Sequence, residues 1–133
     1  MTSLWGELPA VPVITTPAKI LNEQAAALQE STSGVIVGSV VQVTPKYIGG
    51  GVAYELRAVV PSLNNYTIRI LVVEHGVLSY PCRATSLRSV GSGGQLNLAD
   101  EAQFIEFLTA CLSDSDLMGL FSNLIAQVRA AAE

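Results

Sequence analysis

The sequence predicts an α+β fold, with an N-terminal helix, a four-stranded antiparallel β-meander and two C-terminal helices packed on the sheet. Two observations support this prediction. Between residues 35 and 84, β-branched and aromatic residues form short runs separated by loops, as is typical of strands. Apolar residues recur with helical spacing after residue 17 and again after residue 100. Because the strands follow one another and the helices flank them, segregated elements are favoured over alternating β and α units.

The chain divides into an apolar, proline-containing leader (residues 1–16) and a single domain (residues 17–133). At 133 residues, one domain can bury most of the surface that its unfolded chain would expose. The leader holds the only tryptophan, Trp5, and has no periodicity, so we expect it to be extended or irregular. Two locations are open for it: against its own domain or in a groove of a neighbouring subunit.

The first helix and the first strand have clear boundaries. Thr16 is expected to cap the helix, and Pro17 suits its first position because the missing N–H would have no partner there. Gly34 is expected to end the helix. The strand follows at 35–43, where Gly38 indicates a bulge or a close approach of another backbone.

The third and fourth strands are predicted to form a hairpin through a two-residue His75-Gly76 turn. Pro81 cannot donate a ladder hydrogen bond, so the last strand is expected at the edge of the sheet. The loop with Gly49 to Gly51 is interpreted as a flexible hairpin tip, because it lacks the Lys and Ser/Thr of a phosphate-binding loop. The hairpin register predicts three cross-strand pairs on one face: Val73 with Leu78, Leu71 with Tyr80, and Arg69 with Cys82.

The C-terminal part begins with a loop at 89–95 and a short apolar stretch at 96–98, which is either a strand or an extended arm. Asp100 and Gln103 form a capping-box pair for the next helix. Ser113 with Asp116 is predicted to cap the last helix in the same way. Its apolar stripe is the most regular helical pattern in the chain, with Leu117, Leu120, Phe121, Leu124, Ile125 and Val128 on one side.

The composition excludes several classes of partner. The net charge is −4 and the basic residues are scattered, which argues against binding of nucleic acid or of a membrane surface.

Only 14% of the residues are charged, against about 25% in a typical domain. The surface is therefore weakly polar or partly covered by another chain, and we expect a homo-oligomer. Without a secretory signal or an apolar stretch of spanning length, we expect a cytoplasmic protein.

Residues that could carry catalysis or bind metal are scarce. The single histidine, His75, is assigned to a turn, and we interpret Cys82 and Cys111 as buried thiols. The glycine-rich stretch 91–94 resembles a phosphate-binding loop only weakly and is interpreted as a connector. Asp114 and Asp116 are assigned to helix capping, since the oxygen ligands of a calcium loop do not follow them. We therefore expect no metal and no cofactor.

The most distinctive polar group consists of Glu55, Arg57 and Arg69, which share a face if the second and third strands are neighbours. One interpretation is ion pairing between strands on a solvated face. The other is a face that binds an anionic ligand or a partner, with Tyr54 or Tyr80 completing the pocket. Trp5 in the leader is a further candidate for partner binding.

These observations favour a non-catalytic protein-interaction module that self-associates. Secretion chaperones and small bacterial immunity proteins are similar in element order, size and acidity, although no motif of this chain assigns it to either family. A small-molecule or anion-binding domain that uses the sheet face is the alternative. An enzyme is disfavoured, because it would need Glu55 or Glu74 in an apolar pocket.

Overall fold

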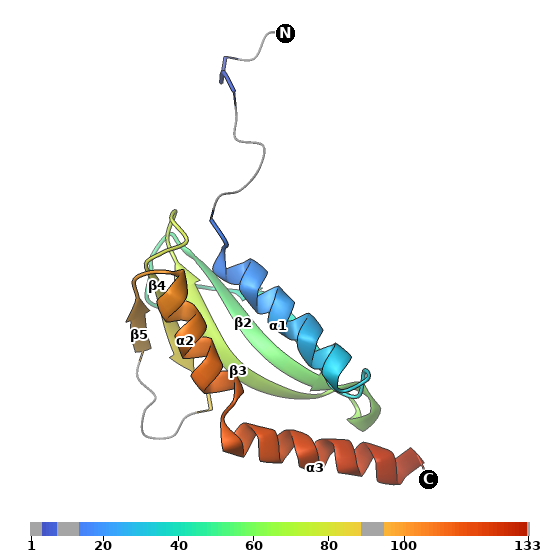
Figure 1. Cartoon of the computed structure of the whole chain (residues 1–133). Helices are drawn as coiled ribbons and strands as arrows, with labels where there is room; N and C mark the ends of the chain where they lie inside the picture. Colours follow the sequence, from blue (N-terminus) through green and yellow to red (C-terminus); the bar gives the residue numbers. More distant parts are fainter. Residues whose placement is uncertain (1–3, 8–13, 89–94, 133) are drawn as a thin grey trace.

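The structure is a computed structural model of the chain, and it describes residues 4–7, 14–88 and 95–132. It confirms the predicted α+β class, with five strands in place of four. Figure 1 shows a curved sheet, helices α1 and α2 lying across one of its faces, and α3 running past its end. The elements in chain order are α1 (Pro17–Ser31), β1 (Val37–Val43), β2 (Val52–Val60), the 3-10 turn η1 (Pro61–Leu63), β3 (Tyr66–His75), β4 (Cys82–Ser86), β5 (Gln95–Leu98), α2 (Glu101–Leu112) and α3 (Ser115–Ala132).

The sheet is an antiparallel meander in which the strands follow one another in chain order. Because side chains alternate between faces, the register defines two surfaces. Leu56, Ala58 and Val60 of β2 belong to the core under the helices, so their side is called the helix face. The opposite side is called the open face, and β2 places Glu55 and Arg57 on it.

A β-bulge between β2 and β3 decides the face on which Arg69 lies. Leu56 pairs with Leu71, whereas Arg57 pairs with Arg69, so β3 has one extra residue, Ile70, at this point. Simple alternation predicts that Arg69 shares a face with Leu71, and that prediction is wrong. The bulge directs Arg69 to the open face, while Ile70 and Leu71 are both buried in the core.

Helix α1 begins and ends as the sequence predicts. The hydroxyl oxygen of Thr16 accepts a hydrogen bond from the amide of Lys19 at 3.2 Å, and Gly34 adopts a φ of +81° after the helix. The helix lies directly on β1, because a Cβ added to Gly38 would be 2.4 Å from the Cα of Ala25. Of the two interpretations of Gly38, the close backbone approach is the one observed.

The predicted two-residue turn between the third and fourth strands is wrong. The connection spans residues 76–81, and pairing resumes with His75 opposite Cys82. Because Pro81 has no N–H to donate, β4 begins only after it. The connection leaves Val77 and Leu78 exposed instead of placing them in a strand. The predicted cross-strand pairs are therefore replaced by Val73 with Ala84, Leu71 with Ser86, and Glu74 with Arg83.

The short apolar stretch after the 89–94 segment forms a fifth strand. β5 pairs with β4, so that Leu96 lies opposite Ala84 and Leu98 opposite Cys82. The strands at the two edges of the sheet are therefore β1 and β5, and the expectation that the last strand of the hairpin is an edge strand is wrong. The predicted glycine-rich connector at 91–94 lies outside the described residues, as does most of the leader.

The two C-terminal helices are capped by aspartates. At the start of α2, Asp100 accepts a hydrogen bond from the amide of Gln103 at 2.9 Å, which confirms the predicted capping pair. The cap predicted at Ser113 is wrong, since Ser113 follows the end of α2. At α3 the carboxylate of Asp114 accepts the Leu117 amide at 3.1 Å, because Asp114 is three residues before that amide.

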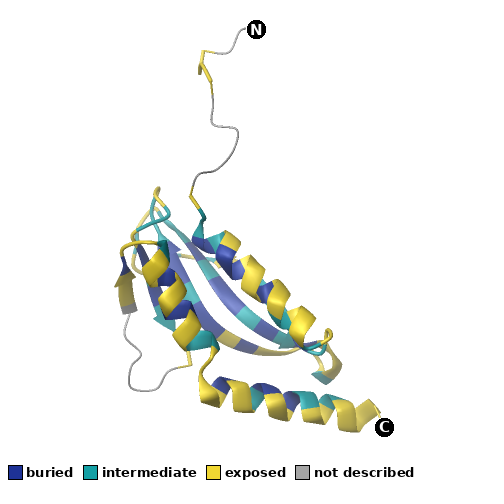
Figure 2. Cartoon of the chain, viewed as in Figure 1, coloured by how far each residue is buried: buried dark blue, intermediate teal, exposed yellow. Residues whose placement is uncertain are grey.

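The core lies between the helix face and the helices, as the dark blue strips of Figure 2 show. Phe104 of α2 and Leu21 of α1 are fully buried there, and Leu117 of α3 is nearly so. Cys82 is buried in the same cluster, and Cys111 is half-buried beside it, in agreement with their assignment as core thiols. No helix in the described part of the chain is long and apolar enough to cross a membrane.

Candidate functional site

The open face carries polar and apolar side chains side by side. Its charged residues lie on β2, β3 and β4, and the half-buried valines lie mainly on β1. In the described chain, α1, α2 and the core residues of α3 all lie against the helix face, so the open face has no helix over it. The residues that form the open face are Val37, Ser39, Val41, Val43, Ala53, Glu55, Arg57, Val59, Thr67, Arg69, Val72, Glu74, Arg83 and Thr85.

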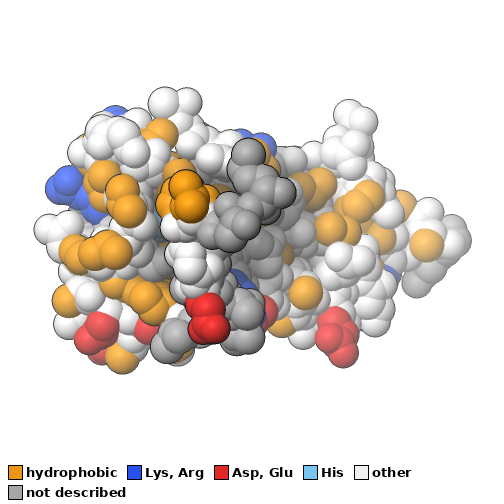
Figure 3. Space-filling view, turned by 90° about the horizontal axis from the view of Figure 1, so that it is seen from above, with side chains coloured by type: hydrophobic (Ala, Val, Ile, Leu, Met, Phe, Trp, Pro, Cys, Tyr) orange, Lys and Arg blue, Asp and Glu red, His pale blue; other side chains and the backbone are white. Residues whose placement is uncertain are grey.

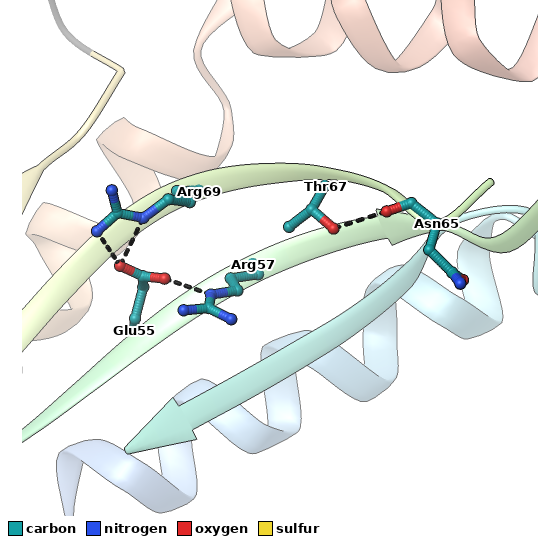
Figure 4. A network of polar contacts seen from close by, with 5 residues as sticks. All are labelled: Glu55, Arg57, Asn65, Thr67 and Arg69. Carbon is teal, nitrogen blue, oxygen red and sulfur yellow. Dashed lines mark hydrogen bonds and ion pairs between the residues drawn. The ribbon is translucent and has the colours of Figure 1, made fainter. Parts of the chain in front are cut away.

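At its centre, Glu55 lies between two arginines from neighbouring strands (Figure 4). Its carboxylate accepts hydrogen bonds from Nε and Nη2 of Arg69 at 2.8 and 2.5 Å, and its other oxygen accepts one from Nε of Arg57. Arg57 and Arg69 are directly opposite in the register, and like charges in that position repel each other. The shared carboxylate offsets this repulsion and holds the two guanidinium groups together.

The environment of Glu55 keeps it ionised. Burial opposes ionisation, yet hydrogen bonds from Arg69 and Arg57, together with their positive charges, lower the pKa of the Glu55 carboxyl below its ordinary value. The same contact raises the pKa of Arg69, whose side chain is 62% exposed. A carboxylate with a lowered pKa is a weak proton acceptor, so this geometry suits charge pairing better than general base catalysis.

A second buried carboxylate on the open face anchors a loop. Oε1 of Glu74 accepts hydrogen bonds from three consecutive backbone amides, those of Lys46, Tyr47 and Ile48, at 2.8, 2.9 and 3.3 Å. The loop between β1 and β2 is thereby fixed against β3. It also returns tightly, since a Cβ on Gly51 would lie 2.4 Å from the carbonyl oxygen of His75. The predicted hairpin tip is thus anchored to the sheet at its centre.

Arg83 forms no ion pair with a carboxylate in the part of the chain that the structure describes. It lies opposite Glu74 in the register, but Glu74 is engaged by the loop amides. The guanidinium of Arg83 instead lies 4.8 Å from the centre of the Tyr47 ring, and the ammonium of Lys46 is 5.4 Å from that centre. Within the described chain, Nε of Arg83 is the buried side-chain nitrogen that lacks a hydrogen-bond acceptor.

With the exception of Arg83, these groups line a hollow of about 390 Å³ between the anchored loop and the sheet. Arg57, Arg69 and Lys46 supply positive charge at its wall, and Thr85 supplies a hydroxyl group. Apolar side chains, among them Val72, complete the lining. The hollow can therefore accommodate a group that is negatively charged at one end and apolar at the other.

The charge of the chain is strongly divided between this site and the rest of the molecule. Lys46, Arg57, Arg69 and Arg83 are four of the seven basic residues, and two acidic residues, Glu55 and Glu74, lie among them. The site thus has a balance of +2. The other three basic and nine acidic residues sum to −6. The fold therefore brings together basic residues that are scattered along the sequence.

The structure brings together only some of the residues proposed from the sequence. Glu55, Arg57 and Arg69 form one cluster. Tyr54 points to the helix face, where its ring stacks on His75 with 6.1 Å between centroids. Tyr80 is also remote from the cluster, because it pairs with residues near the start of α1.

Tyr80 and Trp5 have other surroundings. The hydroxyl of Tyr80 donates to the carbonyl oxygen of Thr15 at 3.0 Å, and its ring lies 6.4 Å from that of Phe104. Burial raises the pKa of Tyr80 to about 12, which leaves it neutral at ordinary pH. Trp5 is 78% exposed in the leader. Neither residue contributes to the hollow on the open face.

Sequence reasoning missed Glu74, Tyr47 and Lys46 as parts of this site. The three glycines of the 49–51 stretch indicated a tight loop, but not where the loop lies. The sequence contains the carboxylate of Glu74 at the end of a predicted strand, but Lys46 is 28 residues away from it, so nothing in the sequence indicates that the two meet.

The described residues contain no group of three or more His, Cys, Asp or Glu that could hold a metal ion. The thiols are poor nucleophiles, because burial raises the pKa of Cys82 to about 11 and also raises that of Cys111. The chemistry that this arrangement offers is recognition by charge and hydrogen bonding.

Comparisons with known proteins assign no family to the chain. No protein-family model matches it, and searches of curated proteins and of solved structures find no significant match. The geometry and the charge of the open face therefore carry the functional conclusion.

Proposed function

We propose that this chain is a non-catalytic protein-interaction module that binds its partner on the open face and also associates with itself. The observation that carries the proposal is the make-up of this face, where half-buried valines lie beside an excess of positive charge. Protein interfaces commonly combine apolar contacts with a few charged groups at the rim. The cytoplasmic location expected from the sequence is part of the same proposal.

Self-association is supported by the sparse charge of the surface. On the face of the molecule that Figure 3 shows, hydrophobic side chains are spread out with few charged side chains between them. On the open face itself, Val37, Val41 and Val59 are only partly buried. Burying part of such a surface against a second copy removes apolar area from water, which stabilises the assembly.

Light scattering on a sizing column tests whether copies of the chain associate through the open face, with Val37→Glu as the variant. Val37 lies on the open face of β1, next to Val59. We expect the wild-type chain to exceed its monomer mass of 14.0 kDa, and Val37→Glu to raise the dissociation constant at least about tenfold, because an unpaired carboxylate is costly to bury. Ala26→Glu in α1 is the matched control, since it adds the same charge at an exposed site of the helix layer.

Two results would contradict the proposal in different ways. A wild-type chain that stays monomeric at every concentration rules out self-association. An assembly that survives in Val37→Glu, with native circular dichroism, places the contact elsewhere than on the open face. The salt dependence of binding distinguishes a second copy of the chain from an acidic protein partner. Because salt screens charges, it should strengthen contact between two positively charged open faces and weaken binding of an acidic protein.

A small-molecule or anion-binding domain is the second candidate function. The hollow beside Arg57 and Arg69 favours it, because its size falls within the range of small-ligand sites, about 300–1,000 Å³. Preferential binding to the folded chain would raise its melting temperature. A ligand screen by thermal unfolding therefore separates this candidate from a module that binds proteins alone.

A further inference from the structure

The two arginines on the open face have unused hydrogen-bond donors. A guanidinium group has five N–H donors. Arg57 uses its Nε for Glu55, and Arg69 uses its Nε and Nη2. Both Nη atoms of Arg57 and Nη1 of Arg69 donate to no other group in the described chain. Glu55 orients both groups without saturating them, so that their remaining donors are available to an external acceptor.

The chain itself does not neutralise the positive charge at this place. Glu55 is shared between two arginines, which leaves one positive charge in excess. Glu74 is occupied by three backbone amides and pairs with no basic side chain. The negative charge of Glu74 still offsets one of the two positive charges of Lys46 and Arg83, so the whole cluster keeps a surplus of two. A ligand with one or two negative charges would complete the balance.

The shape of the site selects for an organic anion over a bare ion. The hollow of about 390 Å³ is several times larger than the share of liquid volume of one water molecule, about 30 Å³. Val43, Val72 and Leu87 line it together with the charged groups. An anionic group can therefore bind the guanidinium groups while an apolar portion contacts these side chains.

The 44–50 loop, which forms one wall of the hollow, is held in place by contacts with the sheet. Glu74 fixes the backbone of the loop, and Tyr47 lies between Lys46 and Arg83. Lys46 is thereby held at the rim, although its own amide, and not its side chain, is the group that contacts Glu74. The side chain of Lys46 can be changed without removing that anchor.

We infer that the hollow between the 44–50 loop and strands β2 to β4 is an oxyanion site, which binds the carboxylate or phosphate group of an organic molecule through Arg57, Arg69 and Lys46. The inference deepens the proposed function without depending on self-association. If a protein partner binds the open face, an acidic side chain of that partner is the group that enters the hollow. If the ligand is free, a small carboxylate or phosphate ester takes the same place.

The test is an NMR titration of the full chain labelled with nitrogen-15. The probes are citrate, glycerol 3-phosphate and a tetraglutamate peptide, with tetraglutamine as the uncharged control. We expect saturable shifts confined to the loop residues 46–48 and to the amides around Arg57, Arg69 and Thr85. Arg69→Gln should weaken binding at least about tenfold, since it removes a charge-assisted donor.

Arg69→Gln also leaves Glu55 with one partner fewer, so weaker binding in that variant could come from partial unfolding. Lys46→Gln is the second test variant, because it leaves the Glu55 cluster intact. It should weaken binding roughly two- to five-fold, as an exposed charge contributes modestly. Lys19→Gln removes the same charge from the exposed side of α1 and should leave the affinity unchanged. Tighter binding of tetraglutamate identifies a partner's side chain as the ligand, and tighter binding of either small anion identifies a free molecule.

Three outcomes would overturn the inference. The first is the absence of saturable shifts with every anionic probe at millimolar concentration. The second is a set of shifts spread over the whole surface. The third is an equal loss of affinity in Lys19→Gln and Lys46→Gln, which would mean that only the net charge matters. None of these outcomes bears on the oligomeric mass measured by light scattering, so the two proposals fail independently.

Discussion

Glu55 is a buried carboxylate whose partners both extend toward solvent. Its residue is fully buried, while the arginine side chains that cover it are partly exposed. Loss of one partner from a buried ion pair is usually more damaging than replacement of the whole set, because a charge is then left without compensation. In this cluster, loss of the carboxylate would also leave Arg57 and Arg69 opposite each other without a shared acceptor.

The pH dependence of stability should report the Glu55 contacts. The folded pKa of Glu55 is lowered below its unfolded value of 4.5, so its contribution to stability is present above pH 4.5 and is lost as the pH falls through the folded pKa. We expect the free energy of unfolding of the wild-type chain to fall below pH 4.5 more steeply than that of Glu55→Gln. Urea unfolding at a series of pH values measures the difference.

Glu23→Gln is the control for this series, because Glu23 lies exposed on α1. Its profile should parallel that of the wild-type chain. Parallel profiles for Glu55→Gln and the wild-type chain would mean that the two arginines do not stabilise the ionised carboxylate, in disagreement with the geometry.

Residue types alone predicted the Glu55 cluster but not its surroundings. Opposite charges two residues apart on β2, with a further arginine on β3, were sufficient to group Glu55, Arg57 and Arg69. The bulge at Ile70 has no sequence signal, since an isoleucine suits either face of a strand. The anchoring of the loop by Glu74 depends on backbone amides, which every residue except proline has.

At the scale of elements, the contact between α1 and β1 rests on Gly38. A methyl group at this position would lie 2.4 Å from backbone atoms of Ala25, and so the helix would have to move away from the strand. We expect Gly38→Ala to destabilise the chain by about 1–3 kcal/mol, as is usual when a tightly packed contact is overfilled. Thermal and urea unfolding measure the loss.

Gly49→Ala is the matched control for Gly38→Ala. Nothing lies within 4 Å of the position that its Cβ would occupy, and its φ is not in the left-handed region. Its stability should therefore stay within about 0.5 kcal/mol of the wild-type value. Equal stability of the two variants would show that α1 does not lie as close to β1 as the structure has it.

In α3, Gly119 offers a prediction of the opposite sign. It lies inside a helix, and a Cβ added there would meet no other atom within 4 Å. Glycine costs a helix interior about 1 kcal/mol relative to alanine, because it loses more backbone freedom on folding. We expect Gly119→Ala to stabilise the chain by up to that amount in urea unfolding. A destabilised variant would indicate that a second copy packs against this position.

Helices were predicted better than strand pairs at this scale. A helix is defined by contacts within a few residues, so the caps at Thr16 and Asp100 could be predicted from neighbours in sequence. Strand register depends on the connection, and Pro81 shifted it by delaying the start of β4. The same shift placed Tyr80 in the connection, away from the arginines with which it had been grouped.

At the scale of the whole molecule, the described residues of the leader differ in their exposure. In the described portion, Leu4 is 97% exposed, while Thr15 is held by Tyr80. We expect a chain that begins at Ile14 to keep its melting temperature within about 4 °C, since the large apolar residues described before that point, Leu4 and Trp5, are mostly exposed. Differential scanning fluorimetry measures this value.

Light scattering on the same shortened chain separates two possible interfaces. An unchanged oligomeric mass is expected if the open face is the contact between copies. A fall to the monomer mass, with an unchanged melting temperature, would instead assign the contact to the leader. A large fall in melting temperature would show that the leader packs on its own domain.

The way Glu74 holds the 44–50 loop separates stability from specificity. The anchor uses backbone amides, so replacing the side chains at 46–48 by anything except proline leaves all three hydrogen bonds in place. The side chains of Lys46 and Tyr47 form part of the rim of the hollow. This wall can therefore diverge rapidly, or be randomised in a library, to change what the hollow accepts while the sheet beneath it stays the same.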